Sequence, residues 1–138
     1  MRKVVLLPSK TKHKIFKYLN RTFEDENYIV FKLCDFIITN YATKETSIVA
    51  DRILKRLNLF IEEYELLKEK PKIYILLVGG IYHNIIVVRR LIEANLDFDL
   101  LIFERRVGKY VIVDSRKYCV KGLGGNSYKR LNWNTYYQ

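Results

Sequence analysis

The stretch KIYILLVGG, residues 72–80, decides the fold of this chain. After Lys72 it is an apolar run with β-branched side chains, which is typical of a strand covered on both faces. Two glycines end the strand, and a helical pattern follows over residues 84–94, with Ile85 and Leu91 on its apolar face. A strand that leads into a helix predicts a parallel sheet here, because parallel strands need such crossover connections.

The segments before this strand predict further helices and strands of one domain. Residues 47–68 have the strongest helical pattern, with apolar side chains at three- and four-residue steps. Residues 3–7 predict a strand, and Ser9 is expected to cap a short helix that ends at residue 19 or 20. The side chains of the long helix that we expect to face the core are Val49, Ile53, Leu57, Phe60, Tyr64 and Leu67.

Three more strands complete the predicted sheet, at residues 28–33, 97–103 and 109–114. The last two are joined by a short connection in which Gly108 suits a positive φ, so we expect a β-hairpin. The order β-α-β-α-β-α-β-β predicts an α/β domain, with a mixed sheet of about five strands and three helices. We expect this single domain to span residues 1–115, with residues 116–138 as a basic, aromatic tail.

Hydropathy and the two cysteines indicate where the protein resides. Residues 73–88 would reach only about 24 Å as a helix, which is short of the roughly 30 Å hydrocarbon core, so we expect no membrane span. The basic start of the chain is followed by too short an apolar run for a signal peptide. Cys34 and Cys119 lie far apart in apolar contexts, which favours buried thiols in a reducing, intracellular compartment.

The positive charges are concentrated at the two ends of the chain, whose formal net charge is +10. Residues 1–21 contain seven bases and no acid, and residues 101–138 contain eight bases and two acids. The segment between them contains ten bases and thirteen acids, which makes its net charge −3. Such asymmetry favours a nucleic acid, an anionic membrane face or an acidic protein as the partner, and a merely solubilising excess of lysine is the alternative.

Both basic ends are expected to contact nucleic-acid phosphates. Residues 10–17 predict a basic amphipathic helix, for which a solvated face is the alternative. The tail combines bases with aromatic rings, as single-strand binding proteins do. The same tail residues would also suit an arm packed on a neighbouring subunit, or a segment folded back on its own sheet. The candidate nucleic-acid-binding residues are Lys10, Lys12, Lys14, Lys17, Arg105, Arg106, Lys121, Tyr128, Lys129, Arg130 and Trp133.

The turn after the strand of residues 72–78 is a candidate ligand-binding site. In open α/β sheets, ligands bind at the carboxyl ends of strands, where helix N-termini offer N–H groups. Gly79 and Gly80 would let the backbone approach a ligand, and His83 or Asn84 would stand at the helix start. His83 is the candidate catalytic residue, because imidazole titrates near neutral pH. No nucleotide-binding glycine motif is present, and a tight turn capped by Asn84 or His83 is the alternative.

The same turn carries a resemblance to a viral family. A hydrophobic strand ending in G-x-x-H, at Gly80 and His83, precedes a helix and a Leu/Phe pair within residues 91–98. Together with the preceding helix around residues 51–59, this pattern resembles a segment of uncharacterised proteins of large double-stranded DNA viruses. The abundance of Ile, Asn, Lys and Tyr is similar to the amino-acid composition of proteins that AT-rich viral genomes encode. The resemblance implies a viral protein, in the host cytoplasm or the virion, and implies no activity.

Side chains that could form a catalytic or metal site are few. The two histidines, His13 and His83, are far apart, and no Cys or His pair has metal-ligand spacing, so we expect no metal and no cofactor. The sequence favours a non-enzymatic protein that binds the phosphate backbone of nucleic acid with little sequence specificity. One alternative is a structural component of a virion or homo-oligomer whose tail packs on a partner. The other is a small enzyme or ligand-binding domain centred on Gly79, Gly80 and His83.

Overall fold

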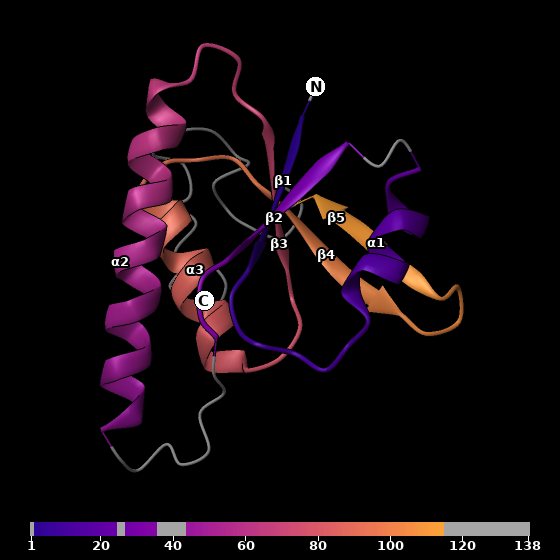
Figure 1. The fold of residues 1–138 in the computed structure, drawn as a ribbon, viewed down its shortest axis with the longest axis horizontal. Coiled ribbons are helices and arrows are strands. Elements are labelled where there is room, and N and C mark those ends of the chain that lie inside the picture. The colour runs from indigo at the N-terminus through magenta and orange to yellow at the C-terminus, as the bar shows by residue number, and fades with distance from the viewer. Residues whose placement is uncertain (1, 25–26, 36–43, 115–138) are drawn as a thin grey trace, which may run out of the picture.

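A computed structural model describes residues 2–24, 27–35 and 44–114, which form a five-stranded mixed sheet with three helices (Figure 1). The strands are β1 (Lys3–Leu7), β2 (Tyr28–Lys32), β3 (Lys72–Leu76), β4 (Asp99–Glu104) and β5 (Lys109–Asp114). The helices are α1 (Ile15–Thr22), α2 (Glu45–Leu66) and α3 (Ile81–Glu93). The predicted α/β class and the predicted order of elements are confirmed. The predicted tail lies outside the described residues.

The strands lie in the order β2-β1-β3-β4-β5. The first four are mutually parallel, as expected around β3, and β5 pairs antiparallel with β4 in the predicted hairpin. The chain steps from β1 to β2 in one direction and from β2 to β3 in the other, so its path reverses between β1 and β3. In open sheets, ligands bind outside the carboxyl ends of the strands beside such a reversal.

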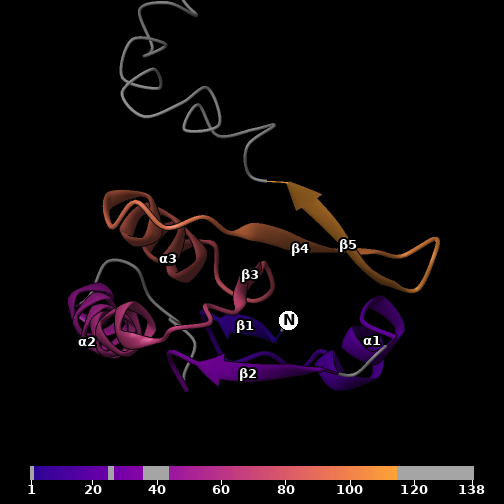
Figure 2. The ribbon, with the colours of Figure 1, turned by 90° about the horizontal axis from the view of Figure 1, so that it is seen from above.

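The two faces of the sheet carry separate cores (Figure 2). On one face, α2 and α3 pack against the side chains of Leu6 and Ile75. On the other face, α1 places Leu19 against Val5 and Tyr110. Neighbouring residues of β1 and β3 therefore enter different cores, because successive side chains of a strand point to opposite faces.

The buried face of α2 agrees with the prediction over most of its length. Val49, Ile53, Leu57 and Phe60 are buried, and Ile61 joins them. The prediction is wrong for Leu67, which is 47% exposed, because α2 ends at Leu66 and the backbone becomes extended at the next residue.

The buried face of α3 differs from the predicted one. The helix begins at Ile81 instead of residue 84, and its buried side chains are His83, Val87 and Leu91. Ile85 is 58% exposed, so its expected place in the core is wrong. This helix is apolar on more than one side, and periodicity alone does not show which apolar stripe meets the sheet.

No helix among the described residues is long and apolar enough to cross a membrane. Residues 73–88, the one stretch considered as a span, divide between β3, the glycine turn and α3.

Candidate nucleic-acid-binding groove at the carboxyl edge of the sheet

The connection from β1 to α1, residues 8–14, crosses the carboxyl edge of the sheet. The prediction that Ser9 caps this helix is wrong, because α1 begins only at Ile15 and no side chain caps it. The Ser9 hydroxyl is completely buried, where it accepts a hydrogen bond from the Gly80 N–H at 3.1 Å and donates one to the Val78 carbonyl at 3.4 Å. Ser9 thus fills the point where the strand order reverses, and the rest of the loop lies over the ends of β1 and β2.

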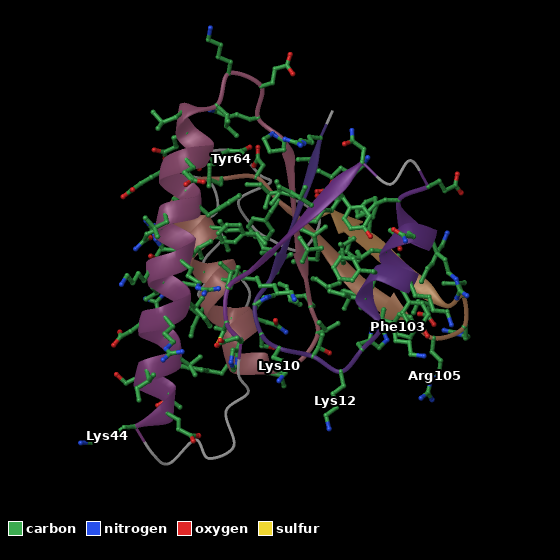
Figure 3. The ribbon with its side chains drawn as sticks, in the orientation of Figure 1. Lys10, Lys12, Lys44, Tyr64, Phe103 and Arg105 are labelled. Carbon is green, nitrogen blue, oxygen red and sulfur yellow. The ribbon has the colours of Figure 1, made fainter. Side chains whose placement is uncertain are left out.

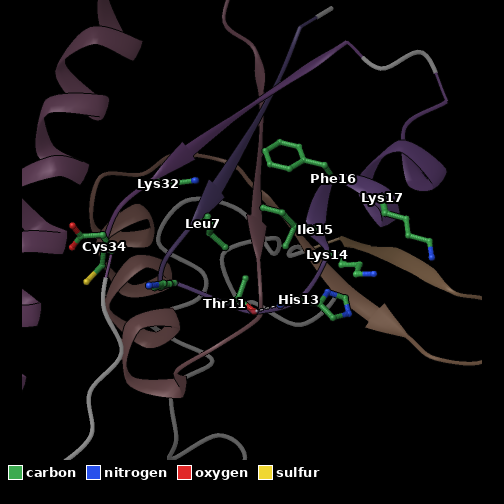
Figure 4. Close-up of a pocket in the computed structure, with 11 residues that line it drawn as sticks. Leu7, Thr11, His13, Lys14, Ile15, Phe16, Lys17, Lys32 and Cys34 are labelled. Atoms are coloured by element: carbon green, nitrogen blue, oxygen red, sulfur yellow. Dashed lines mark hydrogen bonds between the residues drawn. The ribbon is translucent and has the colours of Figure 1, made fainter.

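A pocket of about 670 Å³ lies between this loop, α1 and the end of β2 (Figure 4). Leu7 and Ile15 form part of its apolar lining, and Asp35 is the one carboxylate among its described residues. Its lysines come from the loop, from α1 and from β2: Lys10, Lys14, Lys17 and Lys32. None of these four lysines forms an ion pair with another described residue. Such an excess of uncompensated ammonium groups favours an anionic ligand.

A smaller pocket of about 320 Å³ adjoins the first and shares Cys34 and Asp35 with it. Its outer wall is α2, which contributes bases at positions three and four residues apart, on one face of the helix. We call the two pockets together the basic groove. Its charged residues are Lys10, Lys14, Lys17, Lys32, Asp35, Arg52, Lys55 and Arg56.

Two contacts join α2 to the end of β2 and shape the groove. The Arg56 guanidinium donates a hydrogen bond from Nη1 to the Lys32 carbonyl at 3.0 Å. Arg52 lies 3.8 Å from the Asp35 carboxylate, and both side chains are largely exposed. Because this pair is exposed and at the limit of ion-pair distance, it contributes little to stability.

Other predicted phosphate contacts lie at the same edge of the molecule. Figure 3 shows Lys12 and Arg105 along this edge, and also Lys44, because α2 runs antiparallel to the strands and begins here. Arg106 is 90% exposed and forms a surface ion pair with Glu104 at 3.3 Å. The tail candidates Lys121, Tyr128, Lys129, Arg130 and Trp133 lie outside the described residues.

Sequence reasoning missed Lys32, Arg52, Lys55 and Arg56. They belong to the middle of the chain, whose net charge of −3 hides how its charges are arranged. In α2, Arg52, Lys55 and Arg56 lie around the middle of the helix, whereas Glu62, Glu63 and Glu65 lie near its end. The signal that could have found the bases of α2 is their spacing, because residues three and four positions apart lie on one face of a helix.

The loop that carries the lysines is anchored through His13. Its Nδ1 lies 2.6 Å from the Tyr110 hydroxyl, and its ring packs against Tyr18 and Phe103 at centroid distances of 4.9 and 4.5 Å. Burial, with a smaller contribution from Tyr18, raises the pKa of the Tyr110 phenol above its ordinary value. The cluster fixes the loop between Lys12 and Lys14 on the β4–β5 hairpin.

Thr22 holds the other end of α1 on the same hairpin. Its hydroxyl lies 2.8 Å from the Tyr110 carbonyl and accepts a hydrogen bond from the Tyr110 N–H at 3.0 Å. Arg21 adds a hydrogen bond to the Gly108 carbonyl at 2.9 Å. Tyr110 lies in β5, which is an edge strand of the described sheet, so Thr22 pairs backbone groups there that no described strand pairs, and Arg21 binds the residue just before β5.

The Gly79–Gly80 turn is closed by side chains of the protein itself. Gly79 has φ +75°, and a Cβ added there would overlap the Ser9 hydroxyl. A Cβ at Gly80 would lie 2.6 Å from Nδ1 of His83, which is completely buried. The glycines therefore make room for Ser9 and His83, while Asn84 lines a separate apolar groove of about 860 Å³ on α3.

Within the described part of the chain, no three His, Cys, Asp or Glu side chains are grouped to hold a metal ion. Cys34 is buried, and Cys119 is outside the described residues. The chain matches no protein-family model, no curated protein and no solved structure.

Proposed function

We propose that the protein binds the phosphate backbone of nucleic acid along the basic groove, with little sequence specificity. One observation carries this proposal: seven bases from the β1–α1 loop, α1, β2 and α2 line two adjoining pockets, whose described lining includes one carboxylate. These segments are separated in the sequence, and only the fold brings their charges together.

The form of the groove favours an extended polyanion. It continues from α1 past the ends of β1 and β2 to α2, and its bases line it along the way. A single small anion would contact only part of this lining, whereas a phosphate chain presents one charge per nucleotide along its length. Further bases, Lys12 and Arg105, lie along the same edge (Figure 3).

The chemistry of these side chains favours backbone contacts over base readout. Contacts to phosphates position a protein on nucleic acid and carry no direct sequence information. The lysine side chains of the groove are exposed and flexible, and each ends in an ammonium group that attracts phosphate as a point charge. Affinity should therefore fall steeply with salt, with a slope of about 0.9 per contact on duplex DNA or about 0.7 on single strands.

The test is a titration of labelled single- and double-stranded oligonucleotides over about 50 to 300 mM salt. The Lys10→Glu/Lys14→Glu and Arg52→Glu/Lys55→Glu variants should each bind at least about tenfold more weakly, with a salt slope shallower by about two contacts. The matched control is Arg2→Glu/Lys68→Glu, which changes the charge equally with exposed residues at the opposite edge of the sheet. It should bind nearly as well as the wild type.

Two outcomes would overturn the proposal. If the control loses as much affinity as the groove variants, only the total charge matters and the groove has no role. If the wild-type protein binds no oligonucleotide at about 50 mM salt, where phosphate contacts are strong, the groove does not serve nucleic acid.

A further inference from the structure

Phe16 is an exposed aromatic ring on the wall of the basic groove. It is 53% exposed, although its neighbour Ile15 is buried. Figure 4 shows its ring between Lys32 on one side and Lys17 on the other. About half of this phenyl group is open, and its place among lysines suits a ligand with an apolar surface as well as negative charge.

A second hollow lies on the other side of this ring. It has a volume of about 480 Å³ and is lined by Phe16, Asn20, Tyr28, Ile29 and Val30. Ile29 is 46% exposed, and the Asn20 side-chain carbonyl accepts a hydrogen bond from the Tyr28 hydroxyl at 2.6 Å. Phe16 lines both this hollow and the larger pocket of the basic groove, so the ring stands between a cationic surface and an uncharged hollow with apolar and polar lining.

Single-stranded nucleic acid has both chemistries that these surfaces fit. Its phosphates need cations, and its unstacked bases find aromatic rings on which to stack. In a duplex the bases stack on one another, so their faces are closed to a protein ring. The exposed phenyl group beside Lys14 and Lys17 therefore has a use on single strands that it lacks on duplexes.

We propose that Phe16 is a stacking platform for a nucleobase, and that the groove consequently prefers single-stranded nucleic acid. This inference rests on the proposed function. The phosphates on either side of the stacked base would lie toward the lysines of the groove, and the base would cover the phenyl face between the two hollows.

The experiment compares Phe16→Ala and Phe16→Tyr with the wild type, on a single strand and on a duplex of equal length. Phe16→Ala should weaken single-strand binding by about tenfold and leave duplex binding unchanged, while Phe16→Tyr, which keeps the ring, should match the wild type. Because stacking releases no counterions, the salt slope of Phe16→Ala should equal that of the wild type. Thermal unfolding serves as the control for folding, and Tm should hardly change, since the side chain is exposed.

A second measurement reads the stacking directly. The Phe16→Trp variant should gain a fluorescence signal that a single strand quenches, when the wild-type signal from Trp133 is subtracted as the baseline. A duplex should quench it much less.

The stacking proposal is overturned if Phe16→Ala binds single strands as tightly as the wild type, or loses equal affinity on both nucleic acids. The Lys10→Glu/Lys14→Glu variant, measured in parallel, separates this failure from failure of the proposed function. If that variant weakens both nucleic acids while Phe16→Ala weakens neither, backbone binding stands without stacking. If the wild type binds neither nucleic acid at about 50 mM salt, both proposals fail.

Discussion

Two strand-to-helix connections lie side by side at the carboxyl edge of the sheet, and they differ in whether they are open. The β3–α3 turn contains two glycines, yet Ser9 and His83 occupy the space that these glycines leave. The β1–α1 loop contains no glycine, yet it borders a lysine-lined pocket of about 670 Å³. Glycine therefore marks where the protein's own side chains approach the backbone, whereas a longer loop with exposed bases makes the open site.

Ser9 couples the two connections, since it belongs to the open loop and closes the neighbouring turn. Its hydrogen bond to the Gly80 N–H joins residues 71 positions apart in the chain. The comparison thus predicts that changes in the closed turn lower stability, and that changes in the open loop lower affinity for the ligand.

The largest expected effect is that of Gly79→Ala. The positive φ of Gly79 costs an L-residue roughly 1–2 kcal/mol, and the added methyl group would overlap the Ser9 hydroxyl. We expect the free energy of unfolding to fall by about 3 kcal/mol, measured by urea denaturation.

The matched control is Gly108→Ala, which also has a positive φ, of +62°, but meets only the flexible end of Arg21. Its free energy of unfolding should fall by only about 1–2 kcal/mol, which is the cost of the positive φ alone. Equal losses for the two alanine variants would mean that Ser9 does not close the turn.

His83→Ala tests the closed turn from its other side. The side chain is completely buried, so its removal should lower the free energy of unfolding by about 2–3 kcal/mol. Oligonucleotide affinity, measured well below the unfolding temperature, should stay within about twofold of the wild type. A folded His83→Ala protein that has lost binding would instead support the turn as a ligand site.

Thr22→Val tests the clamp that holds α1, and with it the open loop, on the hairpin. The substitution keeps the shape of the side chain and removes the hydroxyl that bonds both backbone groups of Tyr110. We expect a loss of about 1–2 kcal/mol in the free energy of unfolding, because those groups lose a partner. Thr22→Ser keeps the hydroxyl, so its free energy of unfolding should fall clearly less. If the two variants are destabilised equally, the packing of the Thr22 methyl group is responsible instead of the hydrogen bonds.

The smallest effect is a pH dependence from Tyr110. Its pKa is raised above the ordinary value of 10.0, chiefly by burial, so the folded state favours the neutral phenol. The unfolded chain then releases its proton first as pH rises, and the free energy of unfolding should be constant below about pH 9 and fall above about pH 10. Comparing stability at about pH 8 and pH 11 checks this sign.

Tyr64 must be separated from Tyr110 in that measurement. Its pKa is also raised, by burial and by Asp97, so it contributes a fall of the same sign. Tyr110→Phe should reduce the alkaline loss, and Tyr64→Phe/Tyr110→Phe should reduce it further. If the double variant loses as much stability at high pH as the wild type, other titrating groups cause the loss.

The candidate site could be predicted only in part. Lys10, Lys14 and Lys17 were expected to contact phosphate because they are neighbours in the sequence and no acid lies among them. Lys32 and the bases of α2 were not expected, since their relation to that run depends on which strands are neighbours and on which edge α2 begins. The exposure of Phe16 was hidden for a similar reason, because it looked like one more apolar residue of an amphipathic helix.

The sequence by itself determined the eight elements, their order and the hairpin, because apolar periodicity and turn residues act over a few neighbouring positions. It also determined that basic charge would dominate the surface. Only the tertiary structure decided the strand order, the buried place of Ser9 and the gathering of seven bases into one groove. These features depend on contacts between residues far apart in the chain. Such contacts depend on how the helices cover the two faces of the sheet, which the hydrophobic pattern of neighbouring residues does not specify.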